Sequence, residues 1–590
     1  MQLKITTLTP VHIGSGEKLS SLEYVVHQNT FYKISERDFL LFLNSLEDKN
    51  KPREFADWVG KMYAELFRLE GERKQNPNDN RIKREYYNVR DTLNPIGFCN
   101  QLDDKNFTYN KFLNFIKKNN IPKSGVEKGR IEGQVNEAIK TIDIATGVNR
   151  LYIPGSSLKG ALRTAVLYHW MSNHADRREI IDLIDRRIRE RPVENRFAKP
   201  LEVKAFYCAV PKGKKDDEKY DLMKLVMFAD AHLETPDNST NVEDIKLFVT
   251  QREPGRNRGE FVWEPTIQKQ APYAETIKSQ KTLTTDLSFN VEFLYAIKDR
   301  IDTEKNAIKI GDDWHWKGIS TKVKALFALD IQTLTSDNLD EKRKEVVQHL
   351  IDTMRTFCRR QLKSEHDWID NYLKNFEVSQ VRREEARLDK NLKAGYQKVF
   401  KESHSYLMHL GFGTGFRGIT EMLYFLEDDD RKDLMKRIMK MYAIGYRGDR
   451  NGKRDYMPNP DRFPKSRRLT YSQYDISPLG WLQLDSKDLK SIEKTKIPDE
   501  DELALPTVQP VFYNKKINLR RGAEIEAQVI KSGGLTKPNI VKLYIAEDNM
   551  PEVPLSAYRS ALEVGTVVIV AATFKGDGSI QNAAFRKLKK

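Results

Sequence analysis

Residues 151–163 read Leu-Tyr-Ile-Pro-Gly-Ser-Ser-Leu-Lys-Gly-Ala-Leu-Arg, and this stretch is the most informative in the chain. It predicts a short strand, a tight turn at Pro154-Gly155, and a helix capped by Ser156 or Ser157. Amide groups at a serine-capped helix start point outward, where the helix dipole favours an anion. The stretch therefore predicts a binding site about the size of one phosphate group.

Lys159 and Arg163 lie four positions apart in this helix and therefore share one of its faces. The chain has 590 residues and a net charge of +15, so nucleic acid backbone is the first partner to consider. A purely structural interpretation stays open, because such turns are common and surface cations are usually only solvated. A Walker A loop is disfavoured, since Ala161 and Leu162 stand where that motif needs Lys and Ser or Thr.

A second glycine cluster, Gly411-Phe-Gly-Thr-Gly-Phe-Arg-Gly418, formally satisfies the GxGxxG pattern of dinucleotide-binding sites. Such a site would need a following strand and an acidic residue about 20 positions on. The chain continues instead into Asp428-Asp429-Asp430 and a basic helical stretch. We interpret the cluster as a loop that lets the backbone approach a bulky ligand, with Arg417 available for phosphate or base stacking. A dinucleotide-dependent enzyme stays open as an alternative.

Residues 446–471 combine cations with aromatic side chains, and their glycine and proline residues are typical of a loop. Cations for phosphates and rings for base stacking are the combination that single-stranded RNA recognition uses. A solvated basic loop is the alternative, and we favour RNA contact over it. The cations are Arg447, Arg450, Lys453, Arg454, Arg462, Lys465, Arg467 and Arg468, and the aromatic residues are Tyr446, Tyr456, Phe463 and Tyr471.

Four motifs occur in a fixed order along the chain. They are Leu8-Thr-Pro-Val-His-Ile-Gly-Ser-Gly16, the turn and helix start over 153–163, the glycine loop over 411–418, and Phe463-Pro-Lys-Ser-Arg467 followed by Pro478-Leu-Gly-Trp481. With these motifs the sequence resembles the RAMP superfamily of CRISPR-associated RNA-binding proteins. More narrowly, it is similar to the fifth subunit of the type III-A (Csm) effector complex. The resemblance spans residues 1–40, 140–320 and 400–485.

The resemblance implies an α+β fold with two ferredoxin-like (RRM-like) modules and helical insertions. It implies a non-catalytic subunit that caps the backbone filament of the complex and contacts the 3′ part of the guide RNA. Other RAMP subunits are the expected protein partners, and target RNA is a further candidate. The cutting subunit of the family has an aspartate in the loop after its first strand, where this chain has Gly14-Ser-Gly16-Glu17.

The motifs and the resemblance together define the candidate RNA-binding residues. They come from the loop after the first strand, the turn and helix start, the glycine loop and the basic segment. They are His12, Gly14, Gly16, Gly155, Ser156, Ser157, Lys159, Arg163, Gly411, Gly413, Gly415, Arg417, Lys465 and Arg467.

No catalytic residue is assigned. The alternative function is a metal-independent RAMP endoribonuclease that processes guide precursors, with His12, His404 or His409 as general acid or base. For each of them a hydrogen-bonded structural histidine is the competing interpretation. The pairs His169/His174 and His404/His409 are five residues apart, which is the wrong spacing for one helical face, and no zinc site is indicated.

The pattern divides the chain into a first module over 1–320 with a helical insertion at about 50–140, a helical segment over 321–400, and a second, degenerate module over 401–485. A charged linker follows. Beyond it, short stretches in which apolar and polar residues alternate predict the strands of a small, OB-like β-barrel over 507–590. Whether that barrel would contact RNA or protein stays open.

Two local expectations concern the first module. Residues 222–229 predict a buried strand interrupted by Lys224, and Asp230 at its end is expected to fix a turn through its side chain. Residues 282–295 predict a further strand. The three cysteines are far apart, and neither a signal peptide nor an apolar run of membrane length is present, so we expect a cytoplasmic protein without metal or cofactor.

Overall fold

The computed structural model describes most of the chain. The described residues are 1–102, 107–119, 123–126, 131, 134–142, 149–189, 199–208, 218–235, 239–254, 261–268, 273–378, 383–415, 418, 424, 429–441, 446–448, 454–456, 466–472, 475–489, 524–532, 538–543, 551–556, 562, 566–574 and 580–588. Two compact units are present. The first contains residues 1–251, 265–368 and 384–503, and the second contains residues 252–264, 369–383 and 504–590.

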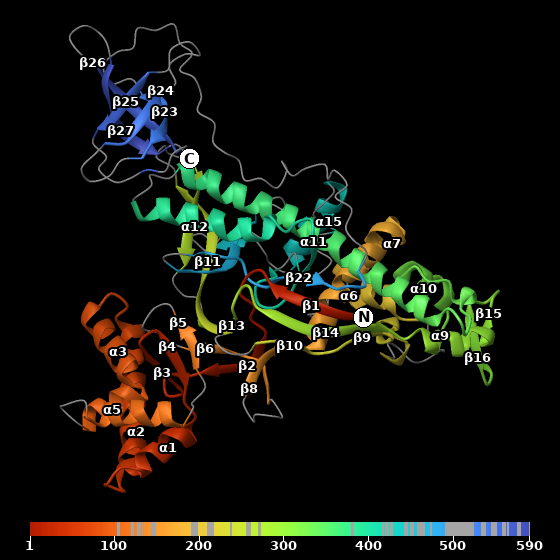
Figure 1. Ribbon diagram of the computed structural model, residues 1–590, viewed down its shortest axis with the longest axis horizontal. Helices are drawn as coiled ribbons and strands as arrows, with labels where there is room; N and C mark the ends of the chain where they lie inside the picture. The colour runs from red at the N-terminus through yellow and green to blue at the C-terminus, as the bar shows by residue number, and fades with distance from the viewer. Residues whose placement is uncertain are drawn as a thin grey trace. The chain divides into compact units, whose positions relative to one another are not determined.

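The first unit contains an antiparallel sheet whose strands come from sequence segments far apart (Figure 1). In spatial order its strands are β18 (Tyr406–His409), β22 (Trp481–Asp485), β1 (Gln2–Thr7), β14 (Thr282–Phe289), β10 (Ala231–Leu233), β8 (Asn149–Ile153) and β7 (Lys140–Ile142), with β9 (Val226–Phe228) paired to β14. β1 pairs antiparallel with both β14 and β22. The segments 1–320 and 401–485 therefore both contribute strands to one sheet.

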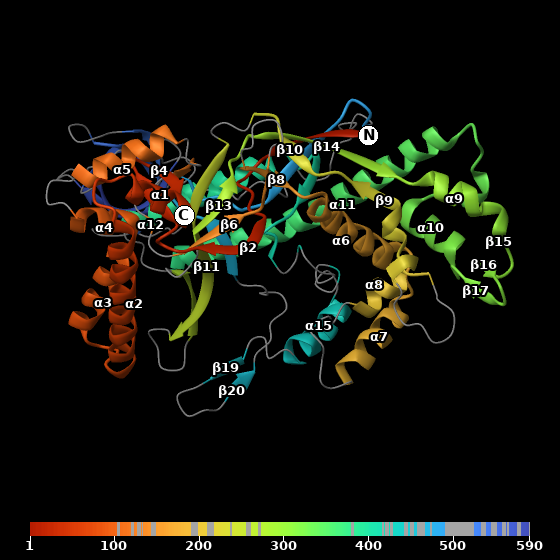
Figure 2. The same ribbon diagram turned by 90° about the horizontal axis from the view of Figure 1, so that it is seen from below.

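In β1 and β14, side chains alternate between a buried and a more exposed face of this sheet. Leu3 and Ile5 of β1 are fully buried, and so are Leu283 and Leu287 of β14, whereas Lys4 is exposed. This period of two is what a half-buried strand requires. Helix α6 (Gly155–Asn173) packs on β9 and contacts α8 (Lys199–Phe206) and α10 (Ile319–Phe327), as Figure 2 shows.

A second sheet of the first unit has the long strand β11 (Thr240–Pro254) near its centre. Its order is β2 (Gly14–Leu19), β6 (Val135–Ala138), β13 (Tyr273–Ile277), β11, β5 (Lys123–Val126), β4 (Thr30–Lys33) and β3 (Tyr24–His27), and β12 (Phe261–Gln268) and β21 (Ser466–Thr470) also pair with β11. The predicted loop Gly14–Glu17 is therefore the start of strand β2. Its pairing with β6 shifts register between Gly14 and Lys18.

The predicted helical insertion consists of α2 (Lys51–Gln75), α3 (Asn80–Thr92), α4 (Pro95–Leu102) and α5 (Phe107–Lys118), which pack with α1 (Glu36–Asn44). Polar caps define the helix starts, since Ser35 and Asp38 form a capping box at α1 and Asp79 accepts amide bonds at α3. The insertion has its own aromatic core, which includes Phe39, Phe42 and Phe98.

The other α-helices within the described residues are α7 (Arg177–Arg189), α9 (Val291–Ile297), α11 (Leu339–Val378), α12 (Arg383–Phe400) and α15 (Asp429–Met441). One small sheet contains β15 (Ile301–Asp302), β16 (Ala307–Ile310) and β17 (Asp313–His315), and another contains β19 (Tyr446–Gly448) and β20 (Arg454–Tyr456). Two predicted strands are corrected. Leu222–Leu225 is a 3-10 turn before the short β9, because Asp221 caps it through the Met223 amide. β14 ends at Phe289, because Asn290 caps α9 through the Phe293 amide.

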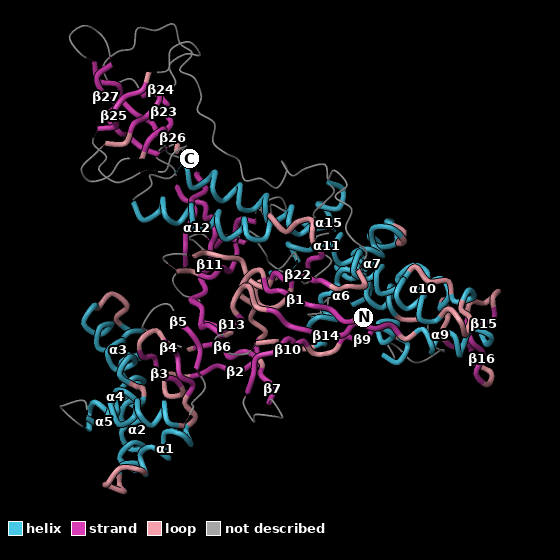
Figure 3. The backbone as a smooth tube through the Cα atoms, in the orientation of Figure 1, coloured by secondary structure: helices cyan, strands magenta, loops and turns pink. Residues whose placement is uncertain are grey.

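The second unit contains a closed five-stranded barrel (Figure 3). Its strands, in order around the barrel, are β23 (Glu524–Lys531), β24 (Ile540–Leu543), β25 (Glu552–Ser556), β27 (Ile580–Leu588) and β26 (Val567–Phe574), and only the β25–β27 pair is parallel. Alternating residues such as Ile525, Ala527 and Val529 fill its interior. The predicted mixed α+β class and the predicted small barrel are confirmed.

Candidate nucleic-acid interface

The turn between β8 and α6 depends on a glycine and on an aspartate from another strand. The Gly155 amide donates to the Asp230 carboxylate at 2.7 Å. A Cβ at Gly155 would lie 2.1 Å from the Phe228 carbonyl oxygen, so only glycine fits this approach. Asp230 therefore has the structural role predicted for it, although the turn that it fixes is the one at Gly155.

The predicted serine cap of α6 is wrong. The helix begins at Gly155, Pro154 occupies the cap position, and no side chain caps the helix. Ser156 and Ser157 consequently lie in the first turn. Ser156 is exposed, and its amide has no recorded partner among the described residues, whereas the Ser157 amide bonds the Pro154 carbonyl at 2.9 Å. An outward amide and two hydroxyls thus remain at the helix start, where the dipole favours an anion.

Lys159 is the available cation at this helix start. It is half-buried, and within the described part of the chain it has no ion pair. Burial lowers the pKa of Lys159 through desolvation, Asp221 opposes the shift, and the neighbouring cations Arg163 and Lys224 lower the pKa further. A phosphate bound here would compensate this positive charge, because an anion favours the protonated amine.

Arg163 does not join Lys159 as an available cation. Its guanidinium pairs with Asp221 at 2.8 Å and with Glu202 at 3.3 Å, and it lies 4.1 Å above the Phe206 ring. These contacts tie α6 to α8 and to the 3-10 turn that starts at Leu222. The predicted phosphate contact of Arg163 is therefore corrected to a structural role.

Lys224 is the second cation that the structure brings to this place. It is exposed, lies in the 3-10 turn before β9, and is close enough to influence Lys159 electrostatically. Sequence reasoning treated it only as an interruption of an apolar stretch. A lysine inside an otherwise buried segment was the signal that could have identified it.

The glycine loop after β18 packs mainly against the chain itself. A Cβ at Gly411 would lie 2.5 Å from the His12 carbonyl oxygen, and a Cβ at Gly413 would lie 2.3 Å from Cβ of Leu479. Gly415 differs, because it is exposed, has φ +62° and has open space around its Cβ position. Of the three predicted glycines, Gly415 alone offers a close approach to an outside ligand. The predicted Arg417 lies outside the described residues.

His12 is a structural residue. Its side chain is buried, its Nδ1 donates to the Glu275 carbonyl at 2.7 Å, and its ring meets the Phe412 ring edge to face. Burial lowers its pKa through desolvation. The predicted RNA contact of the His12 side chain is therefore corrected, whereas Gly14 and Gly16 lie exposed in β2, Gly16 with φ +94°.

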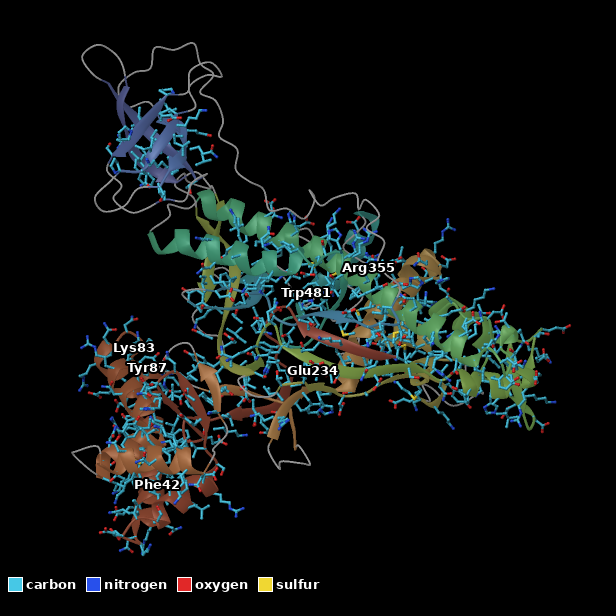
Figure 4. All side chains as sticks on the ribbon, in the orientation of Figure 1. Phe42, Lys83, Tyr87, Glu234, Arg355 and Trp481 are labelled. Carbon is cyan, nitrogen blue, oxygen red and sulfur yellow. The ribbon has the colours of Figure 1, made fainter. Side chains whose placement is uncertain are left out.

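His409 is also held inside the fold. Its Nε2 donates to the Leu479 carbonyl at 3.0 Å, and its ring stacks on Trp481 with the ring centroids 4.1 Å apart. Burial lowers the pKa of His409 to about 4, so the ring is neutral at physiological pH. Figure 4 shows Trp481 among the inner side chains of this unit. A buried, neutral ring bonded in this way is poorly suited to shuttle protons for an outside substrate.

Arg467 and Arg468 lie on opposite faces of β21. Arg467 is 8 % exposed, its Nε lies 2.8 Å from the Glu365 carboxylate, and its guanidinium covers the Trp368 ring. Its predicted RNA contact is therefore corrected, because the side chain is buried in an ion pair. Arg468 is exposed and lies 4.7 Å above the Phe412 ring beside the glycine loop. The predicted Lys465 lies outside the described residues.

The described residues contain no group of three or more His, Cys, Asp or Glu side chains arranged to hold a metal ion. Cys99, Cys208 and Cys358 are buried thiols, and burial raises the pKa of each. None of the described helices combines the length and apolar character that crossing a bilayer requires.

Two curated proteins with similar sequences are both called "CRISPR system Cms protein Csm5". The protein from Streptococcus thermophilus is 31% identical over 169 residues, which cover 28% of this chain and 37% of that protein. The protein from Methanocaldococcus jannaschii is 22% identical over 497 residues, which cover 82% of this chain and 88% of that protein. The first match thus spans little more than a third of the relative's length.

Two solved structures are also similar. One is a chain in the cryo-EM structure of a Csm–crRNA–target RNA ternary complex of a type III-A CRISPR-Cas system, with TM-score 0.46, 17% identity and coverage of 82% of this chain and 100% of that chain. The other is the crystal structure of T. onnurineus Csm5, with TM-score 0.38, 16% identity and coverage of 81% and 99%.

The family model of the RAMP superfamily matches residues 4–417. This match includes most of β1, the turn at Gly155 with α6, and the glycine loop after β18 up to residue 417. Because this family model matches well over half of the chain, the chain belongs to the RAMP superfamily.

Proposed function

We propose that this chain is a non-catalytic guide-RNA-binding subunit of a type III-A CRISPR ribonucleoprotein. It caps the backbone filament at the 3′ side of the guide RNA and supports guide maturation in antiviral defence. The relatives named Csm5 and the net charge of +15 support this proposal. We also interpret the two sheets of the first unit as elaborated ferredoxin-like modules of the superfamily.

The helix start at Gly155 is the observation that carries the proposal. The outward Ser156 amide, the unpaired Lys159 and the exposed Lys224 together favour a phosphate group without any change in the fold. Backbone amides and cations that contact phosphate position a nucleic acid but do not read its sequence. This suits a subunit that must hold guides of many sequences.

A second contact is proposed at Arg468, Phe412 and Gly415. The exposed guanidinium stacked on Phe412 offers a cation and a flat surface next to the open Gly415 position. Unstacked RNA bases bind such flat surfaces, and the guanidinium can also neutralise a phosphate. Other RAMP subunits and target RNA are the further partners that we propose.

The absence of catalysis is also part of the proposal. Two of the three candidate histidines, His12 and His409, are buried and bonded to backbone carbonyls. The endoribonuclease alternative then rests on His404. Incubation of the isolated chain with labelled guide precursor tests it, because cleavage that is lost in His404→Ala would establish the alternative and contradict our proposal.

The decisive experiment is co-purification from the native host. We expect a tagged chain to bring down several RAMP proteins together with CRISPR-derived RNAs that share a fixed 5′ tag. Recovery of the chain alone, or with heterogeneous RNA, would contradict the capping role. In that case a free-standing RNA-binding protein would be the better description of the RAMP chain.

A further inference from the structure

Helix α3 of the helical insertion, together with Arg73 near the end of α2, carries a row of aromatic and cationic side chains. The rings of Tyr86 and Tyr87 meet at 76° with their centroids 5.5 Å apart. The Arg73 guanidinium lies 4.4 Å from the centre of Tyr86, and the Arg90 guanidinium lies 4.8 Å from the centre of Tyr87. We call these four residues the α3 ladder.

Neither tyrosine of the α3 ladder belongs to the hydrophobic core of the insertion. Tyr87 is 43% exposed, whereas the rings that fill the core, such as Phe42 and Phe98, are almost fully buried. Figure 4 shows Tyr87 on α3 with Lys83 beside it, away from Phe42 among the packed helices. The exposed ring is therefore available to a partner.

Two unpartnered cations accompany the exposed ring. Lys83 lies one helical turn before Tyr87 and so shares its face, and Arg84 is exposed next to it. Neither has an ion pair among the described residues, whereas nearby Arg68 is bound by both Glu65 and Glu72. Over residues 80–92 four cations (Arg81, Lys83, Arg84, Arg90) stand against two carboxylates (Glu85, Asp91), a net charge of +2.

An exposed ring beside two unpaired cations favours a single-stranded nucleic acid over an apolar protein surface as the partner. An apolar protein surface laid on Tyr87 would desolvate Lys83 and Arg84 without supplying opposite charge, which is costly. A single-stranded nucleic acid supplies both components, since its bases stack on rings and guanidinium planes and its phosphates neutralise cations.

We propose that the α3 ladder, together with Lys83 and Arg84, is a binding surface for single-stranded RNA. Bases stack on the exposed face of Tyr87, and Lys83 and Arg84 contact the adjacent phosphates. The surface belongs to the helical insertion and shares no residue with the helix start at Gly155. It does not depend on the CRISPR assignment, because any single-stranded RNA has the required chemistry.

Photo-crosslinking of the full chain to an oligouridine of about 12 nucleotides, followed by peptide mapping, tests the location. We expect a cross-linked peptide that contains Tyr86 and Tyr87. Cross-links confined to the Gly155 helix start or the glycine loop would overturn this inference and leave the proposed function intact. Cross-links confined to α3 would support the inference and contradict the proposed sites, and their absence everywhere would overturn both.

Substitutions test the chemistry by fluorescence anisotropy of the same labelled oligouridine. We expect Tyr87→Ala to weaken binding about fivefold or more and Tyr87→Phe to retain it, because the ring stacks and the hydroxyl does not. Lys83→Ala with Arg84→Ala is expected to reduce the salt slope by about 1.4. The matched controls are Tyr63→Ala, a ring with 41% exposure, and Arg68→Ala.

Both controls are expected to bind like the parent chain. Unchanged affinity in Tyr87→Ala, or an equal loss in Tyr87→Phe, would overturn the stacking role. An unchanged salt slope in the double variant would overturn the phosphate contacts. Circular dichroism of each variant checks that the helical content is unchanged. If Tyr87→Ala loses helix, the affinity of Tyr87→Phe and the salt slope of the double variant still test the proposal.

Discussion

Arg467 and Arg468 are neighbours in the sequence, yet Arg467 is bound to Glu365 at 2.8 Å inside the fold and Arg468 lies exposed on Phe412. Their strand pairs with β11, with Arg467 opposite Phe248 and Arg468 opposite Leu247. Because successive side chains of a strand point to opposite faces, a shift of one position decides which arginine is buried and which is exposed.

The buried member of this pair is expected to control stability. Arg467→Ala would leave the Glu365 carboxylate buried without its cation, and loss of one partner of a buried pair costs about 3–5 kcal/mol. Arg467→Lys should lose less, because the charge remains while the planar geometry is lost. Urea unfolding of the full chain measures both, and equal stability of parent and Arg467→Ala would refute the structural role.

The exposed member is expected to control RNA affinity instead. Arg468→Ala removes a solvated cation and its stacking on Phe412, so we expect weaker guide-RNA binding and stability within about 0.5 kcal/mol of the parent. Filter binding and urea unfolding on the same preparation separate the two effects. Lys309→Ala is the control, since Lys309 is an exposed lysine on the distant strand β16. A loss of stability as large as in Arg467→Ala would contradict this division of roles.

Lys159 and Lys224 are expected to determine part of the salt dependence of RNA binding. Each single-strand phosphate contact contributes about 0.7 to the slope of log affinity against log salt, so Lys159→Ala with Lys224→Ala should lower the slope by about 1.4. Arg163→Ala should leave the slope nearly unchanged and lower stability, because Asp221 and Glu202 lose their partner. The same slope in the parent and the double-lysine variant would remove the proposed phosphate site.

The buried His409 predicts a specific pH dependence of stability. Its pKa is about 4 in the folded chain, against 6.5 for the ordinary side chain. The unfolded chain therefore binds a proton first as the pH falls, and stability decreases between about pH 6.5 and pH 4 by up to about 3 kcal/mol. Above pH 7 the ring is neutral in both states and contributes no pH dependence.

His409→Phe isolates this contribution, because it keeps a ring to stack on Trp481 and removes the titrating group. We expect its stability to fall less steeply than that of the parent between pH 6.5 and 4, as measured by urea midpoints at each pH. Parallel curves for the two proteins would contradict the assignment. The lost bond to the Leu479 carbonyl lowers the whole curve of the variant but does not change its slope.

The glycine loop allows a matched comparison within a few residues. Gly413→Ala is expected to destabilise the chain severely, because the new Cβ would lie 2.3 Å from Leu479 Cβ. Gly415→Ala meets no neighbour and should cost only about 1–2 kcal/mol from its positive φ. Thermal unfolding distinguishes them, and similar melting temperatures would show that the loop does not pack as described.

The sequence by itself determined the superfamily, the mixed α+β class, the helical insertion and the C-terminal barrel. These features are local, because capping residues, the period of two in β1 and the alternation Ile525, Ala527, Val529 operate within a few positions. The order of short motifs was also visible in the sequence. Asp230 could be assigned a structural role for the same reason, although its partner Gly155 could not be identified.

Only the tertiary structure decided which cations and histidines are available. Arg163 and Arg467 resemble RNA-binding residues in the sequence, but carboxylates that are distant along the chain, Asp221 and Glu365, occupy them. Lys224 becomes a site residue only because β9 passes beside α6. The predicted modules likewise contribute strands to one sheet, because β22 near the end of the first unit's sequence pairs with β1 at its beginning. Such long-range pairings depend on burial and register, and local sequence patterns carry no information about them.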